Sequence, residues 1–313
     1  MQRLSSDRGA VAVMTALLLV PLLVCAGFVI DIGASYVQWR QLQNAADAAA
    51  LAIAQYCGNG NCSPDHNQKT ADFFTSANAG RAATAKVDPV RDNNTVTVTT
   101  KATVNYEFAP VIGTSNNTVT ASATASWGSP TGGPSVLPLT ISLCSFRFQT
   151  GGGLPTGSTA VTIKTTRNDG SECNGRPGHN DVPGGFGWVD VDPGGGCIVT
   201  SIITGHLSSK TGAPPSCPDS LINAQIGNTV LLPIFWDMAR DKNDKIEGGT
   251  NASYIIYAYA AFHLTNFYSK GNDSSITGYF TKFVDLSGAF THDTGSPNTD
   301  RLDTGAQVVT LTA

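Results

Sequence analysis

The stretch LQNAADAAALAIAQ, residues 42–55, decides how this chain folds, because half of its residues are alanine. Alanine has the highest helix propensity, and its small side chain lets another backbone come close. Towards the N-terminus, apolar residues continue to recur every three or four positions, a spacing that places them on one face of a helix with the alanines. The residues of this face are Ile32, Tyr36, Trp39, Leu42, Ala46, Ala49 and Ile53. We therefore predict a helix over residues 31–58, with Gly58 and Asn59 as its stop.

An uncharged apolar run, AVAVMTALLLVPLLVCAGFVI, fills residues 10–30 and leads directly into this helix. A helix of that length rises about 31 Å, which matches the hydrocarbon core of a bilayer. Arg3 and Arg8 precede the run, and the next basic residue after it is Arg40. The positive-inside rule then predicts a single-pass protein of the cell membrane, with a cytoplasmic tail and the bulk of the chain extracytoplasmic.

Two forms of processing are alternatives to a retained membrane anchor. Val24 and Ala26 fit a small-residue signal-peptidase site, and the segment ending at Cys25 resembles a lipoprotein box. The apolar run is long for a signal peptide, and a lipoprotein box needs a residue smaller than Val24 before the cysteine. Both features favour the retained anchor.

The cysteines point to an oxidising compartment. Cys25 lies in the apolar run, and an even number follows it: Cys57, Cys62, Cys144, Cys173, Cys197 and Cys217. An even set on one side of a membrane predicts disulfides. The spacer GNGN lets Cys57 and Cys62 meet, so we expect this pair. The other four cysteines allow three pairings. We favour the pairing that joins neighbours along the chain, which is Cys144 with Cys173 and Cys197 with Cys217.

Composition and motifs argue against several function classes. Only 13% of the residues are charged and the net charge is −4, with no basic stripe that would favour nucleic acid. The sequence contains no G-x-S-x-G, H-E-x-x-H or P-loop pattern. The five histidines are scattered, and the polar loop at 240–251 lacks the EF-hand spacing. We therefore predict no catalytic residue, no cofactor and no metal site.

Small residues on the helical segment are candidates for close contact with other helices. Gly27 lies in the apolar run and Gly33 just after it, while Ala46, Ala49 and Ala50 lie in the alanine-rich part. We expect these residues to pack against helices of other subunits, including further copies of this chain. Packing on the chain's own domain is the alternative for the same face.

The segment 8–54 resembles the N-terminal part of TadE/TadG-like proteins of the Flp (tight-adherence, Tad) pilus assembly system. The resemblance is carried by Arg8–Gly9, the apolar span, the triplet Asp31-Ile32-Gly33, and the later positions Tyr36, Arg40, Leu42-Gln43 and 45–52. It implies a pilin-like membrane-anchored helix, export to the cell surface and a part in pilus or secretion assembly. Val13 stands where processed members would carry glutamate, so the TadG-type, unprocessed anchor is the closer match.

The rest of the chain reads as two soluble regions. A short helix is expected over residues 70–78, with Phe73 and Phe74 facing a core, followed by strands near 83–90, 95–108 and 117–127. The glycine- and proline-rich stretch 128–135 marks a boundary. Beyond it, short strands predict a sandwich or a barrel, with candidates at 136–147, 160–166, 187–191, 198–203, 229–236, 253–267, 275–286 and 307–312.

The predicted fold class is α+β: a long transmembrane, pilin-like helix with a small antiparallel sheet, followed by a mainly-β, sandwich-like domain. The predicted divisions are a tail at 1–9, the membrane helix at 10–30, the helix and β meander at 31–130, and the disulfide-containing extracellular domain at 131–313.

The favoured function is a membrane-anchored structural component of Flp-type pilus assembly or a related secretion system, which acts through helix packing and extracellular contacts. Its predicted partners are the membrane and other Tad pilus or secretion subunits. An alternative is a surface-anchored adhesin that binds a glycan or wall polymer, which exposed Trp127, Trp188 or Trp236 would favour. An anchored hydrolase is a third hypothesis.

Overall fold

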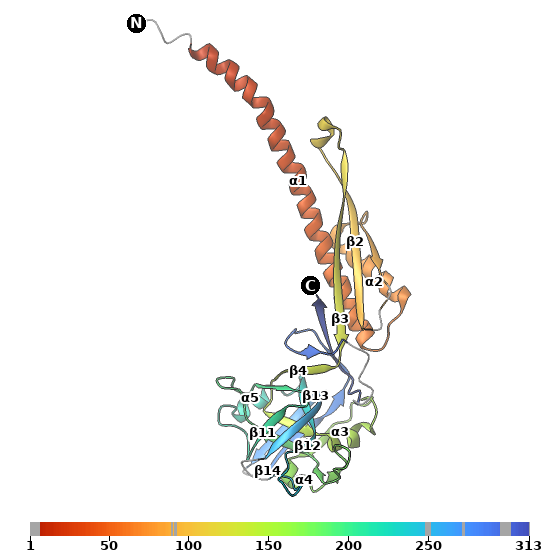
Figure 1. The fold of residues 1–313 in the computed structure, drawn as a ribbon, viewed down its shortest axis with the longest axis vertical. Coiled ribbons are helices and arrows are strands. Elements are labelled where there is room, and N and C mark those ends of the chain that lie inside the picture. Colours follow the sequence, from red (N-terminus) through yellow and green to blue (C-terminus); the bar gives the residue numbers. More distant parts are fainter. Residues whose placement is uncertain are drawn as a thin grey trace, which may run out of the picture.

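The computed structural model describes residues 7–88, 90, 93–247, 252–270, 273–294 and 302–312. A single long helix projects from the molecule, a small sheet lies along its second half, and a larger β domain follows at the far end (Figure 1). The confirmed fold class is a long N-terminal helix followed by a mainly-β domain. Most of the predicted tail, residues 1–6, lies outside the described residues.

Helix α1 (Asp7–Gly58) runs without interruption from the apolar run into the alanine-rich segment. Pro21 lies inside it, and α1 continues through this position although proline removes one helical hydrogen bond. Helix α2 (Pro64–Ala79) follows after a short turn and packs beside α1. It begins earlier than predicted, because Pro64 at the first turn of a helix has no amide to leave unsatisfied.

The first sheet covers one side of α1. Its strand order is β1-β2-β3-β17-β15, with β1 (Thr84–Val87), β2 (Thr95–Asn105) and β3 (Asn116–Gly128) as an antiparallel meander. The remaining members are β15 (Phe283–Asp285) and β17 (Ala306–Thr312). Strand β2 alternates buried and partly exposed residues, as its Thr-Val repeat predicts. Val96 and Val98 on its buried face contact the alanines of α1 in one core.

The C-terminal strand returns to this first sheet. Residues 308–312 of β17 pair antiparallel with 124–128 of β3, and β15 pairs parallel with β17. We call α1, α2 and this five-stranded sheet the first module. A division of the chain at residue 130 therefore leaves out β15 and β17, which belong to the first module. The chain crosses between the two parts more than once, which ties the β domain to the helix-bearing module.

The predicted boundary at 128–135 is itself structured. Residues Pro130–Ser135 form strand β4, which pairs with β10 (Val199–Ile202) and with β16 (Thr291–His292). Gly132 and Gly133 are required here because the side chains of Ile202 and Phe290 lie where a Cβ atom would be. The glycines permit close packing within a sheet, and the stretch is not a flexible linker.

The larger β domain contains a closed ring of five strands. Around the ring, each strand pairs with the next, and the pair β5–β12 is parallel. The ring strands are β5 (Leu139–Ser142), β9 (Phe186–Val189), β11 (His206–Lys210), β13 (Ser253–Lys270) and β12 (Thr229–Met238). We predicted a sandwich-like domain, with a barrel as the alternative, and this closed pairing favours the barrel.

Further elements extend the ring. The second half of β13 pairs with β14 (Asp273–Thr281), which pairs with β6 (Val161–Lys164). The others are β7 (Glu172–Cys173), β8 (Val182–Pro183), α3 (Leu143–Thr150), α4 (Thr166–Asp169), α5 (Asp219–Asn223) and the 3₁₀ helix η1 (Ala109–Ile112). The strand predicted over 136–147 is wrong in its second half, which is α3. Ser142 caps that helix by accepting the Ser145 N–H at 3.1 Å, and Gly151 ends it in a left-handed conformation.

Candidate functional site: the helix at the membrane exit

The first half of α1 exposes apolar side chains on every face. These exposed residues are Val11, Val13, Met14, Leu17, Leu18, Leu19, Val20, Leu22, Leu23, Val24, Val29 and Ile30. By length and composition, α1 contains a segment apolar enough to cross a membrane. An unpartnered apolar surface of this extent is unfavourable in water, so the first half of α1 needs a lipid or protein environment.

The second half of the same helix is a core element of the chain's own module. Ala46, Ala49 and Ala50 are fully buried and contact the first sheet in one cluster with Ile53 and Val98. Our expectation that these alanines serve other subunits is therefore corrected to the alternative we left open. Because alanine side chains are small, the backbone of α1 can lie close to the strands, with Val96 and Val98 in the same core.

Asp31 stands where the two halves of α1 meet. Its side chain is only 4% exposed, and its carboxylate accepts three backbone N–H groups. The donors are Glu107 at 2.9 Å, Phe108 at 3.1 Å and Ala109 at 2.7 Å. These residues begin the turn between β2 and β3. An ionised acceptor makes such bonds short and strong, so Asp31 fixes the turn to the helix.

Two further contacts hold the same turn to α1. The ring of Phe108 lies about 2.8 Å from the position of a Cβ atom at Gly27, so that position has no room for a side chain unless the ring moves. Ser35 Oγ donates to Tyr106 Oη at 3.2 Å. Gly27, which we predicted for contact between subunits, therefore contacts the chain's own hairpin.

The opposite face of α1 remains open just beyond the apolar run. A Cβ atom built at Gly33 would meet nothing within 4 Å. Tyr36 and Trp39 are exposed and stack with ring centroids 6.1 Å apart, and the Arg40 guanidinium lies 6.0 Å from the Tyr36 ring centroid. Amphipathic rings at this point of a helix are typical of a membrane interface. Gly33 thus stays a prediction for contact with another subunit.

Three disulfides join the six cysteines of the soluble region, and Cys25 is free and exposed. The bonded pairs are Cys57–Cys62, Cys144–Cys173 and Cys197–Cys217, with Cα–Cα distances of 4.1, 5.7 and 4.7 Å. This is the pairing that adjacency along the chain favours. The disulfides fit an extracytoplasmic location.

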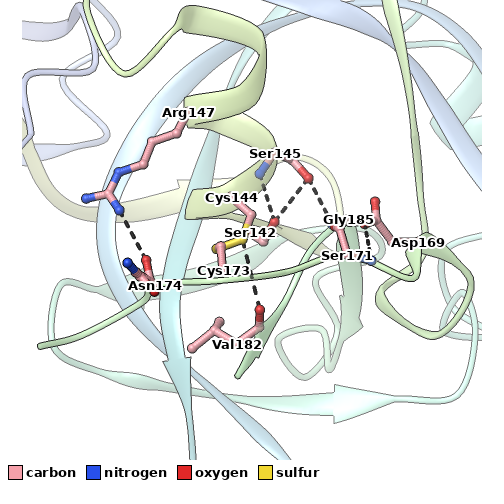
Figure 2. Close-up of a disulfide and its surroundings, with 10 residues drawn as sticks. All are labelled: Ser142, Cys144, Ser145, Arg147, Asp169, Ser171, Cys173, Asn174, Val182 and Gly185. Carbon is pink, nitrogen blue, oxygen red and sulfur yellow. Dashed lines mark hydrogen bonds between the residues drawn. A yellow bond between two sulfur atoms is a disulfide. The ribbon is translucent and has the colours of Figure 1, made fainter. Parts of the chain in front are cut away.

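The bond between Cys144 and Cys173 ties α3 to the segment that follows α4 (Figure 2). Beside it, Ser145 Oγ accepts the Gly185 N–H at 2.8 Å, and Arg147 Nη1 donates to the Asn174 carbonyl at 3.1 Å. A groove of about 560 Å³ adjoins this disulfide. These contacts hold α3 against the segments around residues 174 and 185 (Figure 2).

The tryptophans that would favour a glycan-binding surface do not provide one. Trp127 and Trp188 are buried in two separate cores, and Trp236 is partly buried and stacks on Tyr257 with centroids 4.5 Å apart. An aromatic ring must be exposed to stack on a sugar. The adhesin hypothesis therefore gains no support from these residues.

A buried carboxylate organises one end of the β domain. Asp237 is 1% exposed; its Oδ1 accepts from Arg240 at 3.2 Å, and its Oδ2 lies 3.2 Å from His179 Nδ1. Arg240 also binds Asp181 through both terminal nitrogens. Among the described residues, no three His, Cys, Asp or Glu side chains are placed to share a metal ion. Arg240 thus joins Asp237 to Asp181 within the chain.

The role of Asp31 was not apparent in the sequence. An acidic residue after an apolar run reads as the end of a membrane span, and only the fold brings residues 107–109 to its carboxylate. One signal in the sequence could have indicated this role. Asp31 lies on the same helix face as Leu42 and Ala49, and a carboxylate that only contacts water is not expected on an apolar face.

Comparison with known proteins agrees with the N-terminal assignment. Residues 9–55 match the model of a family described as putative Flp pilus-assembly TadE/G-like. The resemblance read from residues 8–54 is thereby confirmed for this segment, which covers the apolar half of α1 and most of its core half. No curated protein and no solved structure matches the chain.

Proposed function

We propose that this chain is a membrane-anchored structural component of Flp-type pilus assembly or a related secretion system. The observation that carries the proposal is the division of α1. Its first half exposes apolar side chains on all faces, and its second half forms the core of a disulfide-bonded module. The match of residues 9–55 to a pilus-assembly family supports the same function.

In this proposal the helix crosses the cell membrane once, with the N-terminus in the cytoplasm and the modules outside. Contacts with other subunits use the open face of α1 rather than the alanine face. At 100° per residue, Val29, Gly33, Tyr36 and Arg40 lie within one stripe, opposite Asp31 and Leu42. The glycine permits close approach, and the aromatic residue beside it supplies contact area.

A crosslinking experiment in membranes tests this proposal. A photoreactive amino acid replaces Gly33 in the full-length chain, and a second variant carries it at Ser76 on the exposed side of α2. We expect both chains to stay with the membrane after alkaline extraction, and products of higher mass to form from position 33 only. Release of the chain by alkali would contradict the anchor. Equal yields at both positions would contradict the contact face.

A further inference from the structure

The turn between β2 and β3, which we call the hairpin tip (residues 106–115), lies beside α1 near the end of its apolar half. The β2–β3 hairpin extends along the helix well beyond the other strands of its sheet (Figure 1). Asp31, Gly27 and Ser35 hold it there through the contacts described above. The position of the tip relative to the helix is therefore fixed by three separate contacts.

These contacts set the depth of the tip. Gly27 lies three residues before Ile30, the last residue of the apolar run, which is about 4.5 Å along the helix axis. Phe108 lies against Gly27, so a helix that places residues 10–30 in the hydrocarbon core brings this ring to the edge of the core. Sliding the helix outwards to keep the tip in water would draw Arg8 into the core, which is costly.

The turn at the end of the tip, residues 108–112, has only apolar side chains. Val111 is 86% exposed and Phe108 is 46% exposed, and Pro110 between them is exposed as well. Residues 105–115 contain no lysine or arginine, and Glu107 is the one charged residue of this stretch. Such a surface fits the acyl boundary of a lipid leaflet, where aromatic and aliphatic side chains gain from burial, better than the headgroup charges.

Backbone amides of the tip donate hydrogen bonds within the protein and do not depend on water. The amides of residues 107–109 donate to Asp31, and Pro110 has no amide hydrogen. The Tyr106 N–H donates to the Ser115 carbonyl at 2.9 Å. Val111, Gly113 and Thr114 donate to carbonyls of Phe108, Pro110 and Ala109. Backbone groups in lipid must find such internal partners, and these amides already have them.

We propose that the hairpin tip inserts into the outer leaflet of the membrane, with Phe108 and Val111 at the acyl boundary and Tyr106 nearer the headgroups. The inference rests on the proposed membrane anchor and adds a second point of membrane contact. Asp31 is then the residue that joins the two insertions. The first module would be held against the bilayer at two points instead of swinging on a single helix.

Depth-dependent fluorescence quenching tests the insertion. The full-length chain carries Cys25→Ala, and one cysteine for an environment-sensitive dye is introduced in each of three variants: Val111→Cys at the tip, Val20→Cys in the anchor and Phe73→Cys on α2. The chain is reconstituted in phosphatidylcholine vesicles that contain nitroxide lipids with the quencher at the headgroup, at the shallow acyl chain or at the deep acyl chain. Phe73 is exposed and apolar, so it is a matched control for Val111.

We expect the deep quencher to act most strongly on position 20, the shallow quencher on position 111, and none of them on position 73. If position 20 is quenched and position 111 behaves like position 73, the insertion is wrong and the anchor stands. If position 20 is not quenched, the anchor fails and the insertion fails with it. A third outcome is that the dye at position 111 is not quenched in vesicles, although its emission in detergent indicates nonpolar surroundings. If that emission also changes when unlabelled chain is added, a second copy covers the tip and the insertion is wrong.

Discussion

Replacing Leu42 by alanine tests the division of α1 into two halves with different surroundings. Leu42 is 0% exposed and packs in a small cluster with Ala83, Ala102 and Ala121. Thr100 Oγ1 donates to the Leu42 carbonyl at 3.0 Å, so the sheet and the helix are held at a set distance. The alanine neighbours cannot extend into the space left by the lost side chain.

Buried Leu→Ala changes cost about 2–5 kcal/mol, with higher values where the site cannot collapse. For Leu42→Ala we expect a loss of about 3 kcal/mol in the free energy of unfolding of the first module. In a module of about 100 residues this lowers the melting temperature by roughly 10–20 °C. The matched control is Leu22→Ala, the same change on the same helix at a side chain that is 67% exposed. It should leave the stability of the module unchanged.

The assay is urea unfolding of the full-length chain in detergent micelles, followed by hydrogen exchange of the amides of β2 and β3. These strands contact Leu42 through Ala102 and Ala121, so their exchange reports the loss directly. The reasoning is refuted if the two variants differ by less than about 0.5 kcal/mol, which is the usual range for surface substitutions. In that case Leu42 would not lie in a core.

The other predictions concern three charged or titratable groups. Asp31→Asn weakens the acceptor for the N–H groups of residues 107–109, so these amides should exchange with solvent about tenfold faster. Asp47→Asn on the same helix is the control and should leave the exchange rates unchanged. Equal rates in the two variants would contradict the role of Asp31 in holding the turn. Asp237→Ala removes a buried carboxylate that faces two arginines, and should cost about 3–5 kcal/mol by urea unfolding; a cost below about 1 kcal/mol would contradict the network. Burial lowers the pKa of His292, and the charge of Asp293 raises it by a smaller amount. As pH falls, His292 therefore binds its proton at a higher pH in the unfolded chain than in the folded one. Stability should therefore decrease as pH falls below about 6.5, and less so in His292→Gln; identical pH profiles would contradict this.

Local patterns were sufficient for the elements of the first module. The alanine repeat with its apolar spacing predicted α1, and the alternation of threonine and valine predicted β2 and β3 within a few residues. Hydrophobic periodicity determines which face is buried, but it does not name the partner. The sequence therefore left open whether Ala46 and Ala49 contact the chain's own sheet or another subunit.

Features that depend on distant residues could not be predicted in this way. Strand β17 was recognised as a strand, but its pairing with β3 joins residues that are far apart in the chain. The sequence of strand β4 resembles a linker because glycine and proline have low strand propensity, and only the neighbouring Ile202 and Phe290 explain its two glycines. The prediction that Phe73 on α2 faces a core is wrong, because this side chain is exposed. The buried residues of α2 include Asn67, which contacts Cys57 of α1, and Ala71, which lies in the core that α1 shares with the sheet.

Site-directed spin labelling along α1 tests the central claim most directly. Single labels at exposed positions from Leu17 to Arg40 are measured in vesicles for collision with oxygen and with a water-soluble nickel chelate, and hydrogen exchange of the Ala46 amide is measured in the unlabelled chain. We predict lipid-like accessibility up to Ile30, water-like accessibility at position 40, and slow exchange at position 46. Water-like accessibility at Leu17 or Leu22 in the reconstituted chain would contradict the claim that one helix leaves the membrane and becomes the core of the extracellular module.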